Sequence, residues 1–126
     1  MPIHFQLDAV SGVPFYRQIL DQVLAGIATG ALTRGERLPT VRALAVELAV
    51  NLNTVARAYK ELEIRGVLST QQGSGTFVAT QEVSLDDVER RRRIGQLVDE
   101  FLARAAAQGL TLGEIRDALA EREGAS

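Results

Sequence analysis

The feature that most constrains the fold is a pair of short amphipathic patterns separated by about three residues, 49–51. The first pattern follows Thr40 and the second follows Asn51. Both residue types are good N-caps, because their side-chain oxygens accept a hydrogen bond from a free backbone N–H. The apolar residues recur at helical spacing, as Leu44, Ala45 and Leu48 and then as Val55, Tyr59 and Leu62. Two short helices joined by so tight a turn are typical of a helix-turn-helix.

A β-hairpin is predicted directly after the second helix. Segments 67–69 and 76–78 are rich in strand-forming residues. Between them, the segment 71–75 contains glycines, which favour a tight turn. A helix-turn-helix followed at once by a hairpin has the element order of a winged helix. We therefore expect an α+β fold that is mainly α-helical.

Two further elements are predicted before the helix-turn-helix. Ile3–Leu7 alternates apolar and polar residues, which predicts a short half-buried strand. From Pro14, a residue suited to the first position of a helix, an apolar stripe at helical spacing runs towards Gly30. The aromatic residues of the chain mostly fit core positions. Among them, only Tyr16 and Tyr59 could keep a hydroxyl at the surface.

The last third of the chain is predicted to form a tail of two helices. Ser84 is a candidate N-cap for the first, whose apolar stripe runs from Ile94 to Ala105, and Thr111 and Glu114 form a capping box for the second. An apolar stripe must be buried somewhere, and two short helices cannot close a core alone. We therefore expect dimerisation through the apolar residues of the tail, namely Leu97, Val98, Phe101, Leu102, Ile115 and Leu119.

The charge of the chain is distributed unevenly. The net charge of −2 argues mildly against a nucleic-acid partner. However, residues 1–80 carry seven basic and six acidic side chains, whereas residues 81–126 carry seven and ten, so the acidity belongs to the tail. We divide the chain into a winged-helix domain, 1–80, and a helical dimerisation or effector region, 81–126. The run Arg90–Arg93 is interpreted as a solvated helix start with local ion pairs, with an auxiliary phosphate contact as the alternative.

The composition excludes several function classes. The chain has no cysteine and one histidine, His4, so it cannot form a disulfide, a zinc–thiolate site or a histidine-rich metal site. No nucleophile–base pair can be assembled from these residues, so we expect no enzymatic activity, no metal and no cofactor. No apolar stretch approaches the roughly 20 residues of a membrane-spanning helix, and no export leader is recognisable. We expect a cytoplasmic protein.

Three ordered blocks, Gly35–Ala45, Asn53–Tyr59 and Gly73–Val78, closely resemble the DNA-binding domain of GntR-superfamily transcription regulators. The short two-helix tail and the amino-acid sequence of the second block resemble those of the YtrA-like subgroup. The resemblance implies a winged-helix dimer that binds an inverted-repeat DNA operator, usually as a repressor. Leu52 and Ala56 depart from residues common in the superfamily, often arginine, and leave the operator sequence open.

The start of the second helix also suits the major groove on chemical grounds. Asn51, Asn53 and Thr54 lie in its first turn, where asparagine can pair with adenine and threonine can reach a base or a phosphate. Simple capping is the alternative role of Asn51. Arg57 lies on nearly the same face as Thr54, so its guanidinium could bind guanine or phosphate. A solvated surface arginine is the alternative.

Two cations and the hairpin complete the predicted interface. The resemblance places a DNA-contacting arginine at Arg42. Lys60, the only lysine, is more suited to the phosphate backbone than to a base, and an ordinary exposed lysine is the alternative. Gly73, Ser74 and Gly75 would form the wing tip, because glycines let the backbone approach the sugar–phosphate wall closely. A plain turn without a DNA contact is the alternative.

The sequence therefore predicts a dimeric, sequence-specific transcription repressor. Whether it has a small-molecule effector stays open. The short tail leaves little room for a metabolite pocket, so any effector site is expected at the dimer interface or between the tail and the DNA-binding domain. The second hypothesis is a protein-interaction adaptor with a winged helix that does not read DNA. The polar, cationic start of the second helix favours DNA binding over this adaptor.

Overall fold

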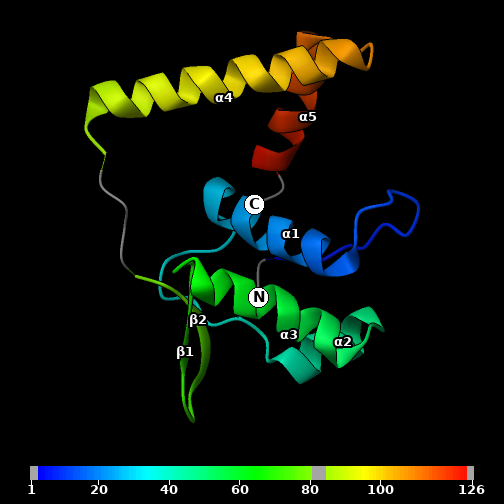
Figure 1. Cartoon of the computed structure of the whole chain (residues 1–126), viewed down its shortest axis with the longest axis vertical. Coiled ribbons are helices and arrows are strands. Elements are labelled where there is room, and N and C mark those ends of the chain that lie inside the picture. The colour runs from blue at the N-terminus through cyan, green and yellow to red at the C-terminus, as the bar shows by residue number, and fades with distance from the viewer. Residues whose placement is uncertain (1–2, 81–84, 125–126) are drawn as a thin grey trace. The chain divides into compact units, whose positions relative to one another are not determined.

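The computed structural model describes residues 3–80 and 85–124. The chain divides into two compact units, Met1–Thr80 and Gln81–Ser126 (Figure 1). Among the described residues, the first unit contains three helices and a two-stranded antiparallel sheet, and the second contains two helices. The predicted fold class, mainly helical α+β with a winged helix followed by a two-helix tail, is confirmed.

The first unit is built around α3 (Leu52–Ile64), which packs against both α1 (Phe15–Thr29) and α2 (Val41–Leu48). α1 begins one residue later than predicted, with Pro14 as its N-cap, and it ends at Gly30 in the left-handed conformation. The apolar stripes of the three helices meet in one hydrophobic core. Its largest fully buried side chains are Tyr59, Ile19, Leu20, Leu32, Leu44, Leu62, Val23 and Val55.

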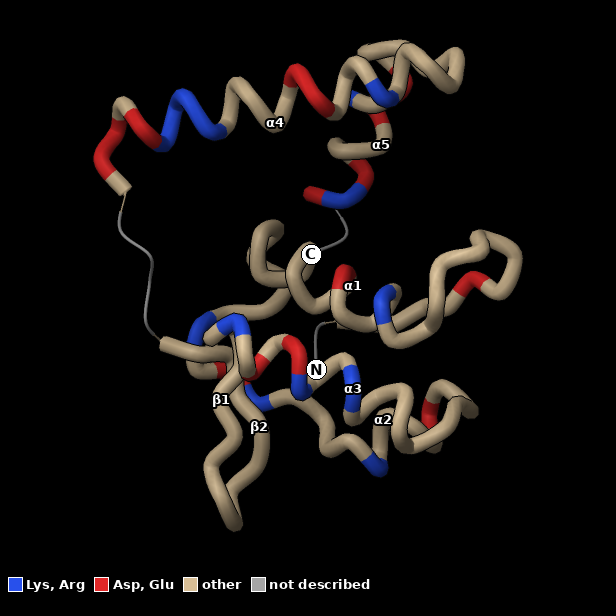
Figure 2. The backbone as a smooth tube through the Cα atoms, in the orientation of Figure 1, with Lys and Arg blue, Asp and Glu red and all other residues tan. Residues whose placement is uncertain are grey.

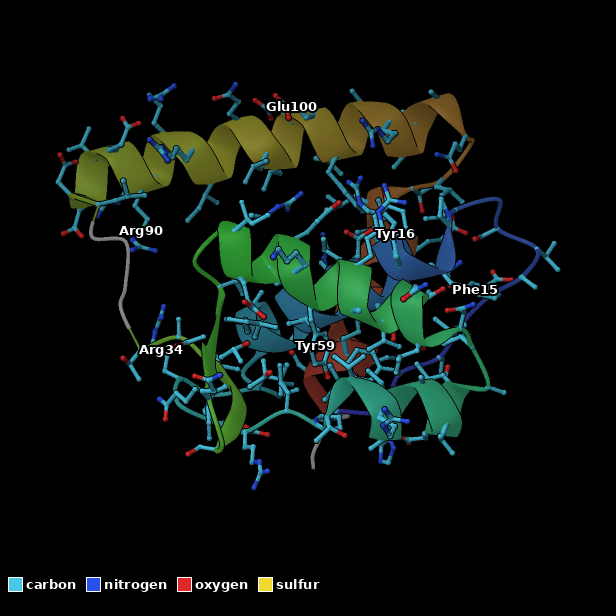
Figure 3. The ribbon with its side chains drawn as sticks, turned by 60° about the horizontal axis from the view of Figure 1, so that its bottom comes forward. Phe15, Tyr16, Arg34, Tyr59, Arg90 and Glu100 are labelled. Carbon is cyan, nitrogen blue, oxygen red and sulfur yellow. The ribbon has the colours of Figure 1, made fainter. Side chains whose placement is uncertain are left out.

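Tyr59 is buried, as its place in the apolar stripe predicts, and its hydroxyl does not stay at the surface. Its side chain lies between the helices (Figure 3), and the residue is 2% exposed. The hydroxyl donates a hydrogen bond of 2.7 Å to the carbonyl oxygen of Pro39, just before α2. Burial raises the pKa of Tyr59 because the charged form would lose its hydration. The ring therefore fills the core while its polar end ties α3 to the entry of α2.

The helix-turn-helix forms as predicted, through capped helix ends. The Thr40 hydroxyl accepts from the N–H of Ala43 at 3.0 Å, and the Asn51 side chain accepts from the N–H of Asn53 at 2.8 Å. Between the helices, Ala49 adopts a left-handed conformation with φ 55° and ψ 45°. This residue ends α2 and turns the chain directly into α3.

The wing is a hairpin of β1 (Leu68–Gln71) and β2 (Gly75–Val78) in which Leu68 pairs with Val78. A third segment, 35–38, joins it along β2. The N–H of Leu38 donates to the carbonyl oxygen of Thr76, and the N–H of Val78 donates to that of Glu36, both at 2.8 Å. Local sequence patterns do not predict this third segment, which ties the start of the helix-turn-helix to the wing.

The predicted strand Ile3–Leu7 does not form. The segment has no regular secondary structure, its apolar residues pack against the core, and it pairs with no strand among the described residues. Instead, the amide of Gln22 on α1 accepts from the N–H of Gln6 at 3.0 Å and donates to its carbonyl oxygen at 2.6 Å. Gln18, one turn earlier, bonds the backbone of Asp8 in the same way, at 2.8 and 2.9 Å. Two glutamine side chains thus provide the hydrogen bonds that a neighbouring strand would supply.

The second unit contains α4 (Asp87–Ala107) and α5 (Leu112–Gly124). The Asp86 side chain caps α4 by accepting from the N–H of Glu89 at 2.8 Å. The helix therefore starts later than predicted, and Ser84 lies outside the described residues. The predicted capping box of α5 is confirmed, since Thr111 and Glu114 exchange hydrogen bonds of 3.0 and 3.2 Å.

Acidic and basic residues are interspersed along α4 (Figure 2). Glu89 accepts from Arg92 at 2.8 Å and from Arg93 at 3.0 Å, as the interpretation of a helix start with local ion pairs predicts. Hydrogen bonds from Arg92 and then Arg93 lower the pKa of Glu89 from 4.5 to about 2. No helix within residues 3–80 and 85–124 is long and apolar enough to cross a membrane.

Candidate nucleic-acid interface

The first turns of α3 present a polar edge to solvent. Asn53 is exposed and Thr54 is half-buried. The side-chain oxygen of Asn51 caps the helix, so the capping role considered for this residue is real. Asn53 and Thr54 are the two polar side chains of this turn that the cap leaves available for a DNA base or phosphate.

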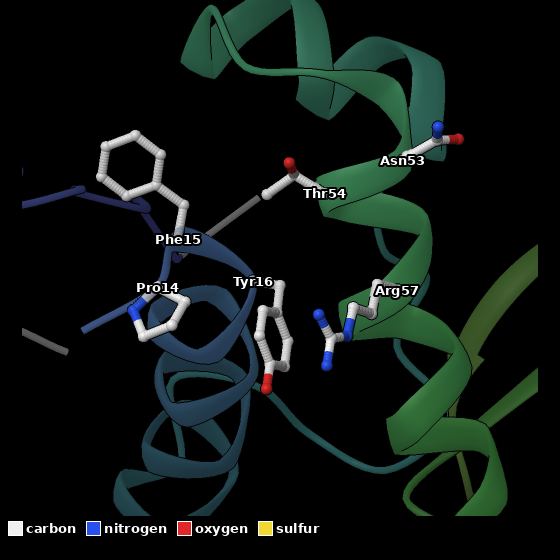
Figure 4. A pocket seen from close by; sticks show the side chains of 6 residues that line it. All are labelled: Pro14, Phe15, Tyr16, Asn53, Thr54 and Arg57. Carbon is white, nitrogen blue, oxygen red and sulfur yellow. The ribbon is translucent and has the colours of Figure 1, made fainter.

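A shallow pocket of about 360 Å³ separates the start of α1 from the start of α3 (Figure 4). Its lining residues are Pro14, Phe15, Tyr16, Asn53, Thr54 and Arg57. α1 contributes the apolar and aromatic side of this pocket, and α3 contributes the polar and cationic side. The sequence predicts only the side of this pocket that α3 forms, because nothing in the local pattern shows that residues 14–16 lie beside residues 53–57.

Arg57 is held between two side chains. Its Cζ lies 3.7 Å from the centroid of the Tyr16 ring, a cation–π contact that Figure 4 shows from close by. On its own helix, Glu61 places a carboxylate oxygen 3.9 Å from the Arg57 Nε. The arginine side chain is still 61% exposed. Arg57 is thus oriented by α1 and remains accessible from solvent.

The other predicted cations lie on the same unit outside this pocket. Arg42 is exposed in the first turn of α2, and Lys60 is exposed on α3, three residues after Arg57. Arg37, which the sequence analysis did not select, is exposed in the segment beside β2. No local signal in the sequence places Arg37 at the wing, because only the pairing of segment 35–38 with β2 brings it there.

The wing tip is a turn in which two glycines adopt positive φ angles. Gly73 and Gly75 have φ values of 83° and 129°, and Ser74 between them is exposed. A Cβ on Gly75 would lie 3.0 Å from the Arg37 Nε, so a larger residue would displace that side chain. The tip therefore combines an open backbone with an arginine at its base, which suits contact with a sugar–phosphate wall.

The tail carries the apolar surface that was predicted to dimerise. Leu97, Val98, Phe101 and Leu119 are 64%, 48%, 57% and 57% exposed, whereas Leu102 and Ile115 are half-buried. Ala105 is the buried residue of α4. A helix that leaves several large apolar side chains open to water has a face suited to another protein surface.

Comparisons with known proteins identify the family. The family model of the gntR family of bacterial regulatory proteins matches residues 15–78. The chain is 47% identical over 74 residues to the HTH-type transcriptional regulator Rv1152 of Mycobacterium tuberculosis, covering 59% of this chain and 61% of that protein. It is 42% identical over 74 residues to the HTH-type transcriptional repressor YtrA of Bacillus subtilis, covering 59% of this chain and 57% of YtrA. The chain thus spans less than two thirds of these two relatives.

A third relative matches over nearly its full length. The chain is 32% identical over 109 residues to the HTH-type transcriptional regulator YhcF of Bacillus subtilis, covering 86% of this chain and 89% of YhcF. Among solved structures, a transcriptional antiterminator from Listeria monocytogenes aligns with a TM-score of 0.68 and 30% identity, covering 96% of this chain and 90% of that chain. The DNA-binding domain of AraR in complex with operator ORX1 aligns at 0.52 and 29%, covering 59% and 92%. The chain therefore belongs to the gntR family of bacterial regulatory proteins, in its YtrA-like subgroup.

Proposed function

We propose that this DNA-binding transcription regulator acts as a homodimeric repressor that binds an inverted-repeat operator. The observation that carries the proposal is the polar and cationic edge of α3, where Asn53, Thr54 and Arg57 line one pocket. One α-helix fits the major groove with its N-terminal residues at the base edges. The relative YtrA, named as a repressor, and the similar AraR domain, solved with its operator, support this function.

Each predicted contact has a distinct role. Asn53 pairs with adenine, Thr54 contacts a base or phosphate, and Arg57 donates to guanine O6 and N7. Arg42 and Lys60 neutralise phosphates. The wing tip Gly73–Ser74–Gly75 lies against the sugar–phosphate backbone, with Arg37 at its base adding a further cationic contact.

The tail face of α4 and α5 holds the two protomers together in this proposal. Its exposed apolar side chains support a protein partner, and a second copy of the chain is the partner that an inverted-repeat operator requires. We place any small-molecule effector at or near this interface, place the protein in the cytoplasm, and assign it no catalytic activity, metal or cofactor.

Selection of the full-length chain on a randomised double-stranded DNA library tests the function. We expect two inverted half-sites whose centres lie about 10 base pairs, or a multiple, apart. A protein-interaction adaptor would enrich no sequence, and that outcome would contradict the proposal.

Replacing the predicted guanine reader gives a residue-level prediction. Arg57→Ala should weaken binding to the selected operator by about 1–3 kcal/mol and relax the preference at one base pair of each half-site. Lys60→Ala is the matched control for loss of a cation from the same helix. It should weaken binding to all sequences alike and lower the dependence of affinity on salt. An unchanged sequence profile for Arg57→Ala would remove Arg57 from the base-reading residues.

A further inference from the structure

The structure points to Tyr16 on α1 as a positioning residue for base recognition by α3. We infer that the Tyr16 ring holds the Arg57 guanidinium in the orientation that reads a guanine, so that Tyr16 helps to determine operator specificity. The inference rests on the proposed function and deepens it. A residue outside the recognition helix would then control which base that helix prefers.

The ring itself is firmly placed. Tyr16 is half-buried and packs against the hydrophobic core of the first unit. One turn further along α1, Ile19 and Leu20 are completely buried, which fixes the helix beneath the ring. The Arg57 Cζ lies 3.7 Å from the ring centroid, within the range in which a cation is attracted to the face of an aromatic ring.

The second neighbour of Arg57 constrains it less. The Glu61 oxygen lies 3.9 Å from the Arg57 Nε, which is too long for a hydrogen bond, and the other oxygen of Glu61 lies 4.0 Å from an Arg65 nitrogen. An ion pair this exposed is strongly screened by solvent. Contact with the ring therefore provides the main orientation of the guanidinium.

This contact favours DNA recognition for two physical reasons. A free arginine side chain has many rotamers and loses that freedom when it binds a base, so a support that restrains it beforehand reduces the loss on binding. In addition, an attraction between the cation and the ring face does not use the N–H donors of the guanidinium. Those donors stay available for the two acceptors on a guanine edge.

The test replaces the aromatic ring of Tyr16 and measures which DNA sequences the variant selects. With the full chain and the randomised DNA library, Tyr16→Leu should relax the preference at the base pair that Arg57→Ala identifies. It should also weaken binding to the wild-type consensus about two- to five-fold per half-site, as expected for an exposed cation–π contact. Tyr16→Phe keeps the ring and should restore the preference. The salt dependence should stay as in the wild type, because Tyr16 carries no charge.

Two further variants separate positioning from a general structural role. In an Arg57→Ala background, Tyr16→Leu should have no further effect on the preference, because the group that it positions is absent. Phe5→Leu removes an aromatic ring that packs against the same core but is not among the residues lining the pocket, and should keep the preference at that base pair. Tyr16→Met repeats the test in a side chain of similar length if the leucine variant folds poorly.

Several outcomes would overturn the inference. It is wrong if Tyr16→Leu weakens binding to all sequences alike, or if its effect is as large in the Arg57→Ala background. If the wild-type chain selects an operator and the Tyr16→Leu variant has the same sequence preference as the wild type, Tyr16 has no positioning role. The proposed function is unaffected by that outcome. A wild-type chain that selects no sequence overturns the proposed function and the inference together.

Discussion

At the residue scale, the turn of the helix-turn-helix depends on a conformation that its residue does not favour. Ala49 adopts φ 55° and ψ 45°, where a Cβ crowds the following carbonyl oxygen. The position is exposed, so no packing of its methyl group compensates for this strain. The N–H of Ala49 donates to Val46, and the N–H of Val50 donates to Ala45, so the turn is stabilised by its hydrogen bonds.

Glycine at this position should therefore stabilise the protein. Ala49→Gly should raise the free energy of unfolding by about 0.5–1 kcal/mol, because glycine adopts the left-handed conformation without strain. Urea denaturation measures the change. Ala43→Gly is the matched control on the exposed side of α2 and should lower the free energy of unfolding by about 1 kcal/mol, since there the backbone is helical. Equal destabilisation by both variants would contradict the strain argument.

At the element scale, α1 organises two other parts of the first unit, the start of α3 and the segment that precedes α1. Its start forms one side of the pocket at α3, and its Gln18 and Gln22 side chains bind the backbone of the N-terminal segment. Gln18 also donates to the carbonyl oxygen of Val13 at 2.8 Å, immediately before the helix. α1 is thus both a core helix and the support for the chain that leads into it.

The hydrogen bonds of Gln22 should be measurable separately from the core. Gln22→Ala removes both bonds to Gln6 and should lower the free energy of unfolding by about 1 kcal/mol, because the bonds are solvent-exposed. Hydrogen exchange at the Gln6 amide should become faster. Gln96→Ala is the control and should leave exchange at Gln6 unchanged, because Gln96 is an exposed glutamine on α4 whose amide donates to the side chain of Glu100. Wild-type exchange at Gln6 in the Gln22→Ala variant would show that the segment is held by packing alone.

At the scale of the whole molecule, the basic excess and the apolar face of α4 belong to different units. The basic excess lies in residues 1–80 and the acidic excess in residues 81–126. The net charge of −2 is therefore the sum of a slightly basic DNA-binding unit and an acidic tail. In the proposed dimer each protomer offers few cationic contacts, so we expect sequence-specific binding to depend strongly on joining two half-sites. The exposed face of α4 is therefore as important for the proposed function as the residues of α3.

A charge placed on that face should separate the protomers. Phe101→Glu puts a carboxylate among apolar side chains, so we expect the dimer to become a monomer in sedimentation equilibrium and binding to the two-half-site operator to weaken. Ala103→Glu adds the same charge two residues later, on the opposite side of α4, and should leave the dimer intact. A dimer that persists in Phe101→Glu would exclude this face as the interface.

Local sequence patterns determined most of the elements of this protein. The helical stripes, the Thr40 and Asn51 caps, the Thr111–Glu114 capping box and the glycine-bearing hairpin could all be predicted, because each depends on residues within a few positions of one another. The same reasoning found the α3 half of the candidate DNA interface, since those side chains share one helix.

Only the tertiary structure decided which of these elements meet. Alternation of apolar and polar residues is the same whether the backbone hydrogen bonds of a segment come from another strand or from glutamine side chains. The strand predicted at Ile3–Leu7 is wrong for this reason. The hydrogen bond from the Tyr59 hydroxyl to Pro39, the pairing of segment 35–38 with β2 and the contact of Tyr16 with Arg57 all join residues distant in sequence. These contacts depend on how the helices pack around a common core, and the periodicity of one helix carries no information about its neighbours.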